Sequence, residues 1–221
     1  MLSQLRLNQL LSPVLPVGAY SYSQGLEWAV QAKWIDNGDS FNLWLDELIQ
    51  GPLAQQELPL LKNLYQAFID ENLPSINYWS QMTVACRDTA ELRAEEHARA
   101  AAYLRVVNNL PYTIEPQYRS SMENTSLTTI AWACVQWGID LPSLLNAFAY
   151  NWLDAYIVNG VKLIPLGQSE GQALLHAKLP LLTQAVETSL RLSDDAIGFS
   201  VPLISMASCR HETQYSRIYR S

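Results

Sequence analysis

The sequence has 221 residues, of which 49% are hydrophobic and 16% are charged, so a shortage of core-forming side chains, the usual cause of disorder, is excluded. The formal net charge of -7 argues against nucleic acid as a partner, because nucleic-acid binding needs clustered Lys and Arg side chains. No run of 18 apolar residues occurs, so the sequence predicts no membrane span and no membrane partner.

The first predicted helix follows Ser21 and Gln24. Their spacing is that of a capping box, in which each side chain satisfies a backbone amide that the first helical turn leaves free. The apolar residues that come next extend this helix to about Trp34. Asp39 or Ser40 can then cap a second helix.

We expect Gly51-Pro52 to interrupt this second helix, because a proline inside a helix removes a backbone hydrogen bond. The strongest helical prediction is DTAELRAEEHARAAAYLRVV, which is rich in Ala, Leu, Glu and Arg. Asp88 and Glu91 repeat the capping-box spacing at its start.

The second half of the chain predicts further helices. SLTTIAWACVQWG is expected to close with Gly138 as a left-handed cap. Asp140 can begin the next helix, which stops before Pro165. A last helix, from about residue 169 to 192, contains Pro180 and is therefore expected to be kinked or divided there. Only YTIEP suggests an extended segment.

These elements predict an all-α, single-domain helical bundle of about eight to ten helices, spanning residues 1–209. Residues 210–221 differ, because they hold three arginines and two tyrosines but few aliphatic side chains. Arg and Tyr are enriched where proteins meet, whereas chain ends are often frayed, and composition alone leaves both possibilities open. We expect this segment to be mobile in the isolated chain and to become ordered on a partner.

The sequence predicts no catalytic residue and no cofactor. It contains no P-loop, no G-x-G-x-x-G and no G-x-S-x-G motif. The histidines are far apart and form no H-x-x-x-H pair, so no metal site is expected. The cysteines show no C-x-x-C spacing and are typical of free thiols in a reducing cytoplasm. The histidines are His97, His176 and His211, and the cysteines are Cys86, Cys134 and Cys209.

Two further patterns have ordinary explanations. Glu95-Glu96, beside arginines three and four residues away, is typical of a solvated helix face with ion pairs. PLGQSEGQ suggests an anion-binding turn at a helix start, but a helix that Gln168 or Ser169 caps is the favoured explanation.

Three segments resemble the signatures of one family. LLSPVLPVGAYSYSQGLEWAV (residues 10–30), VKLIPLGQSEGQALL (161–175) and RHETQYSRIYRS (210–221) are similar, in this order, to those of the UreF urease accessory proteins. The resemblance implies a cytoplasmic, all-α homodimer without enzymatic activity. It also implies that the chain binds UreD (UreH in some organisms), the GTPase UreG and the urease apoprotein. In that complex nickel passes to urease through a tunnel.

Two alternatives accompany this scaffold hypothesis. The chain can modulate GTP hydrolysis by UreG directly, because an inserted side chain can stabilise charge in phosphoryl transfer. An independent nickel-binding metallochaperone is disfavoured by the scarcity of His and Cys.

The candidate partner-binding residues come from the second and third motifs. Lys162 is selected because it interrupts an apolar stretch, and a buried ammonium group needs a partner or an exit to solvent. The full set is Lys162, Gln168, Arg210, His211, Glu212, Gln214, Tyr215, Arg217, Tyr219 and Arg220.

Overall fold

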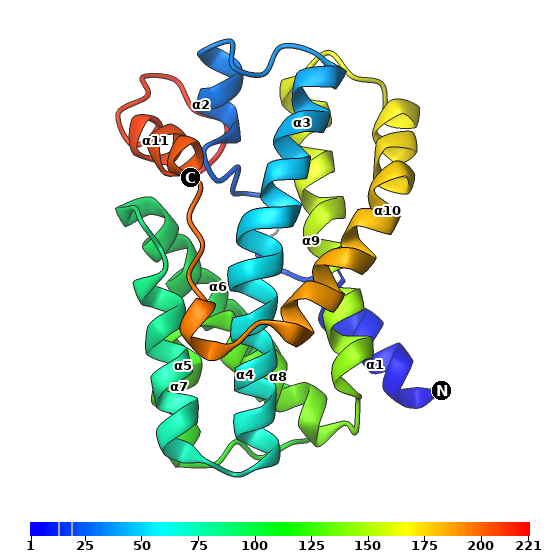
Figure 1. Cartoon of the computed structure of the whole chain (residues 1–221). Coiled ribbons are helices and arrows are strands. Elements are labelled where there is room, and N and C mark those ends of the chain that lie inside the picture. Colours follow the sequence, from blue (N-terminus) through cyan, green and yellow to red (C-terminus); the bar gives the residue numbers. More distant parts are fainter. Residues whose placement is uncertain (13, 19) are drawn as a thin grey trace.

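The computed structural model of the chain describes residues 1–12, 14–18 and 20–221. These residues form eleven α-helices, one π-helix and two short 3-10 helices, with no strand (Figure 1). The all-α prediction is therefore confirmed, and the number of α-helices slightly exceeds the expected eight to ten. None of the described helices is both long and apolar enough to cross a membrane.

The α-helices are α1 (Leu2–Leu10), α2 (Leu26–Gln31), α3 (Gly38–Leu48), α4 (Leu58–Ile69), α5 (Leu73–Ala85), α6 (Ala90–Asn108), α7 (Arg119–Asn124), α8 (Ser126–Gln136), α9 (Leu141–Leu163), α10 (Gln168–Arg191) and α11 (Pro202–His211). The π-helix η1 (Ile49–Glu57) joins α3 to α4, and the 3-10 helices are η2 (Pro116–Tyr118) and η3 (Asp194–Ala196).

Helices α3, η1 and α4 form one uninterrupted rod, so the predicted break at Gly51-Pro52 is wrong. The π-helical turn carries Pro52 inside the helix instead of ending it. Gly51 also allows a close approach, since a Cβ atom there would lie 2.7 Å from the Phe199 ring. The packing of a distant segment against this turn is not visible in the local sequence.

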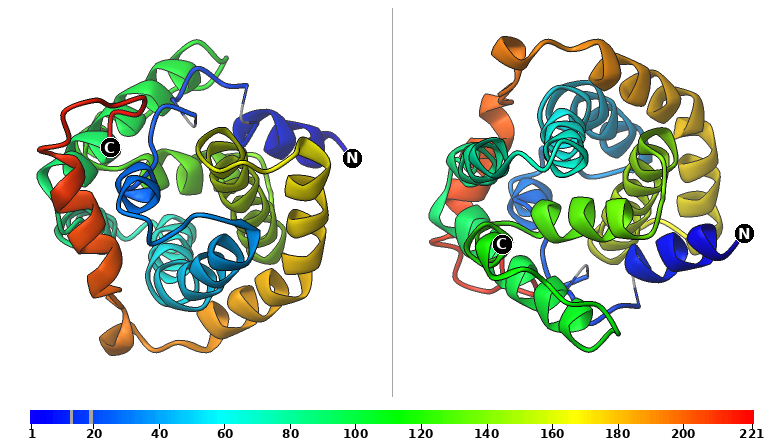
Figure 2. Two further views of the ribbon diagram at one scale, coloured as in Figure 1. Left: turned by 90° about the horizontal axis from the view of Figure 1, so that it is seen from above. Right: turned by 90° about the horizontal axis from the view of Figure 1, so that it is seen from below.

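The rod and α9 lie inside a ring of other helices (Figure 2). Helix α8 packs against α4 and α6, and its residues Ser126–Cys134 are all buried. A helix that is buried on every side needs apolar or small side chains all round, which SLTTIAWAC supplies. Helix α10 covers α9 and η1 from outside.

Several helix starts differ from the prediction. Ser21 does not cap α2, because Gln24 (φ 53°) and Gly25 (φ 84°) adopt left-handed conformations before the helix begins. Helix α3 is capped by Asn37, with Ser40 completing a capping box.

Helix α6 is capped by Thr89 rather than by Asp88. The Asp88 carboxylate instead accepts hydrogen bonds from the hydroxyl groups of Ser200 and Ser205. Each of these shifts moves a helix start by only a few residues.

Other boundaries are confirmed. Asp140 caps α9, whose last residue is Leu163, and Gly138 has the expected left-handed backbone (φ 63°). Helix α10 continues through Pro180 without division and changes direction along its length (Figure 1). Pro180 therefore kinks α10 and does not divide it.

Candidate partner-binding site

The first and third motif segments, far apart in the sequence, lie against each other, and Lys162 of the second segment lies beside Tyr20 of the first. Helix α11 lies against α2 and α6, and residues 212–221 return across them (Figure 1). We call residues 210–221 the tail. The end of α9 completes the site through contacts with residues 20–22 and with the tail.

The backbone of the tail is paired with the segment that precedes α2. The Ser221 carbonyl oxygen accepts hydrogen bonds from the N–H groups of Ser23 (2.6 Å) and Gln24 (3.0 Å) and from the Ser23 hydroxyl (2.7 Å). The Arg220 N–H donates to the Ser21 carbonyl at 2.9 Å. The expectation of a mobile tail is therefore wrong, because these bonds satisfy its polar backbone groups.

Glu27, in the first turn of α2, lies beneath the tail and is only 6% exposed. Its carboxylate accepts the N–H groups of Ile218 (2.7 Å) and Tyr219 (2.9 Å). A buried carboxylate needs several donors to compensate for lost hydration, and the tail backbone provides two of them.

The His211 ring is the third group of the tail that contacts the Glu27 carboxylate. Its Nε2 atom lies 3.2 Å from Glu27, and its Nδ1 atom lies 2.7 Å from Glu91 on α6. Arg217 adds a 2.5 Å contact to Glu91. His211 is fully buried, whereas its neighbours in the sequence, Arg210 and Glu212, are exposed.

The end of α9 holds the N-terminal segment and the tail together. The Asn159 side-chain amide donates to the Tyr22 carbonyl at 2.8 Å, and the Tyr219 hydroxyl donates to the Asn159 carbonyl at 3.4 Å. One helical turn later, the Lys162 ammonium lies 5.2 Å from the centre of the Tyr20 ring. Lys162 is exposed, so its charge remains in solvent beside an aromatic face.

Glu95 connects the tail to the interior. Its carboxylate accepts hydrogen bonds from the Gln24 amide (2.9 Å) and the Ser221 hydroxyl (2.8 Å), and it lies 3.5 Å from Arg99. Burial raises the pKa of Glu95, although Arg99 and the two hydrogen bonds act in the opposite direction. The predicted solvated face is therefore wrong, because Glu95 and Glu96 are each 4% exposed.

Glu96 belongs to a second buried network. Arg87 contacts both Glu57 and Glu96, and Glu96 also accepts the Thr125 hydroxyl at 2.7 Å. Burial opposes ionisation of Glu96, but Arg87, Arg99 and the Thr125 hydroxyl outweigh it and lower its pKa to about 2. This network ties α6 to the end of η1 and to the start of α8.

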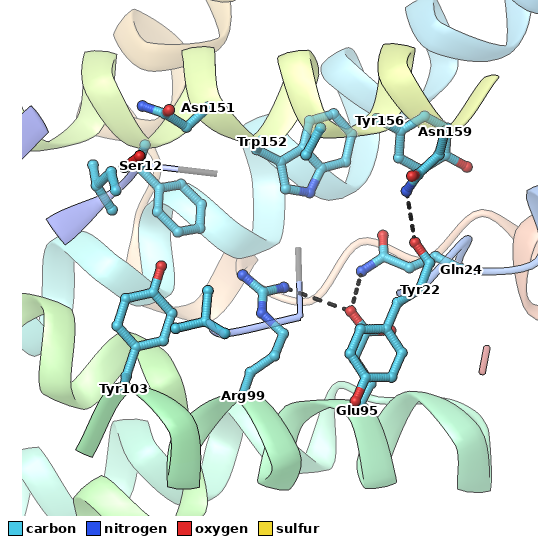
Figure 3. A pocket seen from close by; sticks show the side chains of 14 residues that line it. Ser12, Tyr22, Gln24, Glu95, Arg99, Tyr103, Asn151, Trp152, Tyr156 and Asn159 are labelled. Carbon is cyan, nitrogen blue, oxygen red and sulfur yellow. Dashed lines mark hydrogen bonds and ion pairs between the residues drawn. The ribbon is translucent and has the colours of Figure 1, made fainter. Parts of the chain in front are cut away.

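Two cavities adjoin Glu95. The first, of about 70 Å³, lies between α6 and α9, and Figure 3 shows Arg99 and Trp152 on its opposite walls. The second, of about 80 Å³, lies beside η1 and the segment around Phe199. The residues that line both cavities are Gln24, Glu95, Arg99, Phe148 and Trp152.

The shared wall is polar on the α6 side. The Nε atom of Arg99 and the Oδ1 atom of Asn159, at the far end of the first cavity, have no protein partner within the described part of the chain. A polar cavity with unpaired donors and acceptors is suited to water. The two cavities behind the tail have mainly apolar walls, with the polar groups of Gln24, Glu95 and Arg99 between them.

The structure divides the predicted tail residues into two groups. His211 and Tyr219 are buried and hold the tail in place, and Gln214 is partly buried. The others are exposed, namely Arg210, Glu212, Tyr215, Arg217 and Arg220. Of these, Arg217 is paired with Glu91, and Glu212 accepts the N–H groups of Ala90 and Glu91.

Gln168 lies apart from this site, at the first position of α10, and is exposed. It does not cap the helix, and neither does Ser169, because Gly167 is the capping residue. The Glu170 carboxylate accepts the Gly167 N–H at 2.6 Å. The first turn of α10 is therefore occupied by its own carboxylate, which disfavours the anion-binding alternative.

Glu27, Glu91 and Glu95 hold the tail, although no catalytic or metal motif in the sequence distinguishes them. One signal is present: Glu91, Glu95 and Arg99 follow one another at intervals of four residues, which places them on one face of α6. That face contains both charges and alanines and therefore resembles a solvated surface. Only the structure, in which the tail lies on this face of α6, shows that the face is covered.

No group of three or more His, Cys, Asp or Glu side chains within the described ranges is arranged to hold a metal ion. The three cysteines are free thiols, as expected from their spacing. Burial raises the pKa of Cys134 to about 12, which makes this thiol a poor nucleophile.

Comparison with known proteins places the chain in a family. Residues 35–178 match the family model UreF. The urease accessory protein UreF of Alcanivorax borkumensis is 41% identical over 222 residues, covering 98% of this chain and 97% of that protein. The UreF protein of Pseudomonas putida is 43% identical over 220 residues, with 100% and 98% covered. That of Escherichia coli O157:H7 is 39% identical over 218 residues, with 99% and 97% covered. The chain therefore belongs to the UreF family of urease accessory proteins.

Proposed function

We propose that this chain is a scaffold and coupling factor in the maturation of urease by nickel insertion. The docked tail binds UreD, the surface around Lys162 and Gln168 binds the GTPase UreG, and the assembly engages the urease apoprotein. The family membership supports a place in the urease accessory complex. Experiments must test which surface binds UreD and which binds UreG.

The observation that carries the proposal is the docking of the tail onto the first motif segment and α6, with Lys162 of the second segment beside Tyr20. Buried groups of the site, above all Glu27, fix the backbone of the tail. This leaves Tyr215 (104% exposed) and Ile218 (76% exposed) projecting into solvent, with Arg217 and Arg220 beside them in the sequence. A rigid backbone that presents Tyr and Arg side chains loses little entropy on binding, and these residue types dominate interface energetics.

The two internal cavities support a route for nickel through this subunit. They share a wall that carries Gln24, Glu95 and Arg99 on one side and the aromatic rings of Phe148 and Trp152 on the other. Rearrangement of the three polar side chains would open a passage between the cavities. Carboxylate and amide oxygens on that wall can contact a hydrated cation in transit without forming a closed ligand set.

Direct modulation of UreG is the second candidate. Lys162 and Gln168 are both exposed, so either side chain can reach a nucleotide bound to a partner. GTP turnover by UreG, measured with and without this chain, separates the two functions. If GTP turnover by UreG is unchanged, scaffolding is the function that remains.

The test is co-purification with UreD and UreG. The double variant Tyr215→Ala/Arg220→Ala removes two exposed tail side chains, and we expect UreD affinity to fall more than tenfold with helical content unchanged. Tyr78→Ala/Arg119→Ala is the matched control, because these exposed residues lie on α5 and α7. Equal capture of UreD by both variants would refute the role of the tail.

A further inference from the structure

We propose that His211 is held as an imidazolium cation between two carboxylates, and that this charge latches the tail onto α2 and α6. The attachment of residues 211–221 is therefore sensitive to pH. The inference concerns the chain alone and does not depend on which partner the tail binds.

The geometry of the ring requires two donors. His211 Nδ1 lies 2.7 Å from Glu91 Oε2, and Nε2 lies 3.2 Å from Glu27 Oε2. Ionised carboxylates only accept hydrogen bonds, and a neutral imidazole has a single N–H. A neutral His211 would therefore place a nitrogen lone pair against a carboxylate oxygen, with no water to separate them because the ring is fully buried.

The sum of the charges around the His211 ring also favours a protonated imidazole. The charged groups that face the ring are Glu27 from α2, Glu91 from α6 and Arg217 from the tail. With a neutral His211 these three sum to a net charge of -1 in a largely buried place. An imidazolium brings the sum to zero, which removes the cost of an uncompensated buried charge.

The remaining ionisable groups nearby do not alter this balance. Arg210 and Glu212, on either side of His211 in the chain, are exposed, and Glu212 accepts the backbone N–H groups of Ala90 and Glu91. Tyr219 packs here as well, but burial and the Glu27 charge raise its pKa to about 12, so it stays neutral.

The proton belongs to His211 rather than to Glu27. The Glu27 carboxylate accepts two amide N–H groups, from Ile218 at 2.7 Å and from Tyr219 at 2.9 Å. Such donors favour the ionised form of a carboxyl group. Glu91 is likewise held ionised by the Arg217 guanidinium at 2.5 Å.

The direction of the pH effect follows. The latch is complete where His211 is protonated and both carboxylates are ionised. Raising the pH removes the imidazole proton, restores a net charge of -1 and turns one hydrogen bond into a repulsive contact. The tail then loses the charge-assisted contact of His211 and opens more often, although its backbone bonds and the Arg217–Glu91 and Ser221–Glu95 contacts remain.

The experiment uses the full chain and two readouts. Long-range proton–nitrogen NMR of the imidazole rings reports the protonation of each nitrogen directly. At pH 7.5 we expect both nitrogens of His211 to carry protons, because each faces a carboxylate oxygen. Amide hydrogen exchange of Ile218 and Tyr219 reports the docking of the tail. We expect their protection factors to fall at least about tenfold between pH 6.5 and pH 9, the effect of losing a charge-assisted hydrogen bond.

The chain offers matched controls, because the other two histidines, His97 and His176, are exposed. His211→Gln keeps a hydrogen-bond donor but cannot become charged, so the pH dependence of protection should disappear. His97→Gln and His176→Gln should retain it. A singly protonated His211 at pH 6.5 with the tail docked would overturn the proposal, and so would a pH dependence that survives in His211→Gln. If His211→Gln fails to fold, the ring spectrum of the unmodified chain decides the question.

Discussion

The Glu27 carboxylate accepts the backbone N–H of Tyr219 across a separation of 192 residues. This carboxylate, in the first turn of α2, also receives the Ile218 N–H and the His211 ring. One side chain therefore collects three groups of the tail. Its removal should affect the tail more than the helices.

We expect Glu27→Ala to destabilise the docked tail by about 2–4 kcal/mol, because it leaves buried donors without an acceptor. Tryptic cleavage after Arg217, followed by mass spectrometry at constant pH, should become at least tenfold faster, while helical circular dichroism changes little. Glu123→Ala is the control, since this glutamate is exposed and pairs only with Arg119 within α7. Cleavage at the unmodified rate would show that the backbone bonds of Ser221 suffice.

Arg87 is the centre of the buried network between Glu57 and Glu96. We expect Arg87→Met to lower the free energy of unfolding by about 3–5 kcal/mol, because it leaves two buried carboxylates unpaired. Chemical denaturation measures this loss, with Arg119→Met as an exposed control.

The same network predicts an acid limb of stability. The pKa of Glu96 is lowered from 4.5 to about 2 in the folded chain. Its stabilising contribution is therefore complete above pH 4.5 and is lost as the pH falls towards 2. Denaturation curves at a series of acid pH values should show this slope in the unmodified chain. A slope of equal size in Arg87→Met would contradict the role of Arg87.

Gly25 marks the closest approach of α2 to α11. A Cβ atom there would lie 2.8 Å from the Ser208 backbone nitrogen, and the backbone is left-handed (φ 84°). We expect Gly25→Ala to cost more than about 2 kcal/mol and to loosen α11. Gly138→Ala separates the two causes, because Gly138 is also left-handed but has no atom within 4 Å of the added Cβ. Equal losses in both variants would mean that backbone conformation alone matters.

Lys162→Ala should leave the fold intact, because the side chain is exposed and its contact with the Tyr20 ring contributes only about 0.5–1 kcal/mol. We expect it to reduce urease activation in cells or the fidelity of nickel insertion. Thermal melting checks the fold, and urease activity with its metal content checks the function. Unchanged activation would reduce Lys162 to a surface residue.

The low fraction of charged residues and the exposed apolar side chains predict a homodimer. Leu2 and Leu5 on α1 and Leu203 and Met206 on α11 are more than half exposed. Light scattering at tens of micromolar should give about twice the chain mass of 24.9 kDa. A clean species of 24.9 kDa would contradict the prediction.

Much of the fold can be predicted from the sequence because the boundaries of a helix depend on residues close to them in the chain. The Asp140 cap, the Gly138 turn and the end of α9 before Pro165 each depend on a few neighbouring residues. The break predicted at Gly51-Pro52 does not occur, because the conformation there depends on a segment that is distant in the sequence. The helix continues as a π-helix against Phe199, a residue almost 150 positions away.

The site was harder to predict than the fold. The motif segments were recognised as important, but composition suggested a solvated tail and a solvated Glu95-Glu96 face. Glu95 is paired with the tail through the Ser221 hydroxyl, and Glu96 is paired with Arg87 and Thr125 in the interior. Two polar surfaces that bury one another cannot be told from two exposed ones until their positions are known.

The pairing of the tail with α2 also sets a delay during synthesis. Glu27 emerges from the ribosome 191 residues before Ile218, its hydrogen-bond donor. At about 5–20 residues per second, the interval is roughly 10–40 s, during which the carboxylate has no tail above it. The nascent chain can form many of its helices in this time, but it cannot display the docked tail. Partners that recognise the docked tail therefore encounter it only on chains whose translation has passed residue 218.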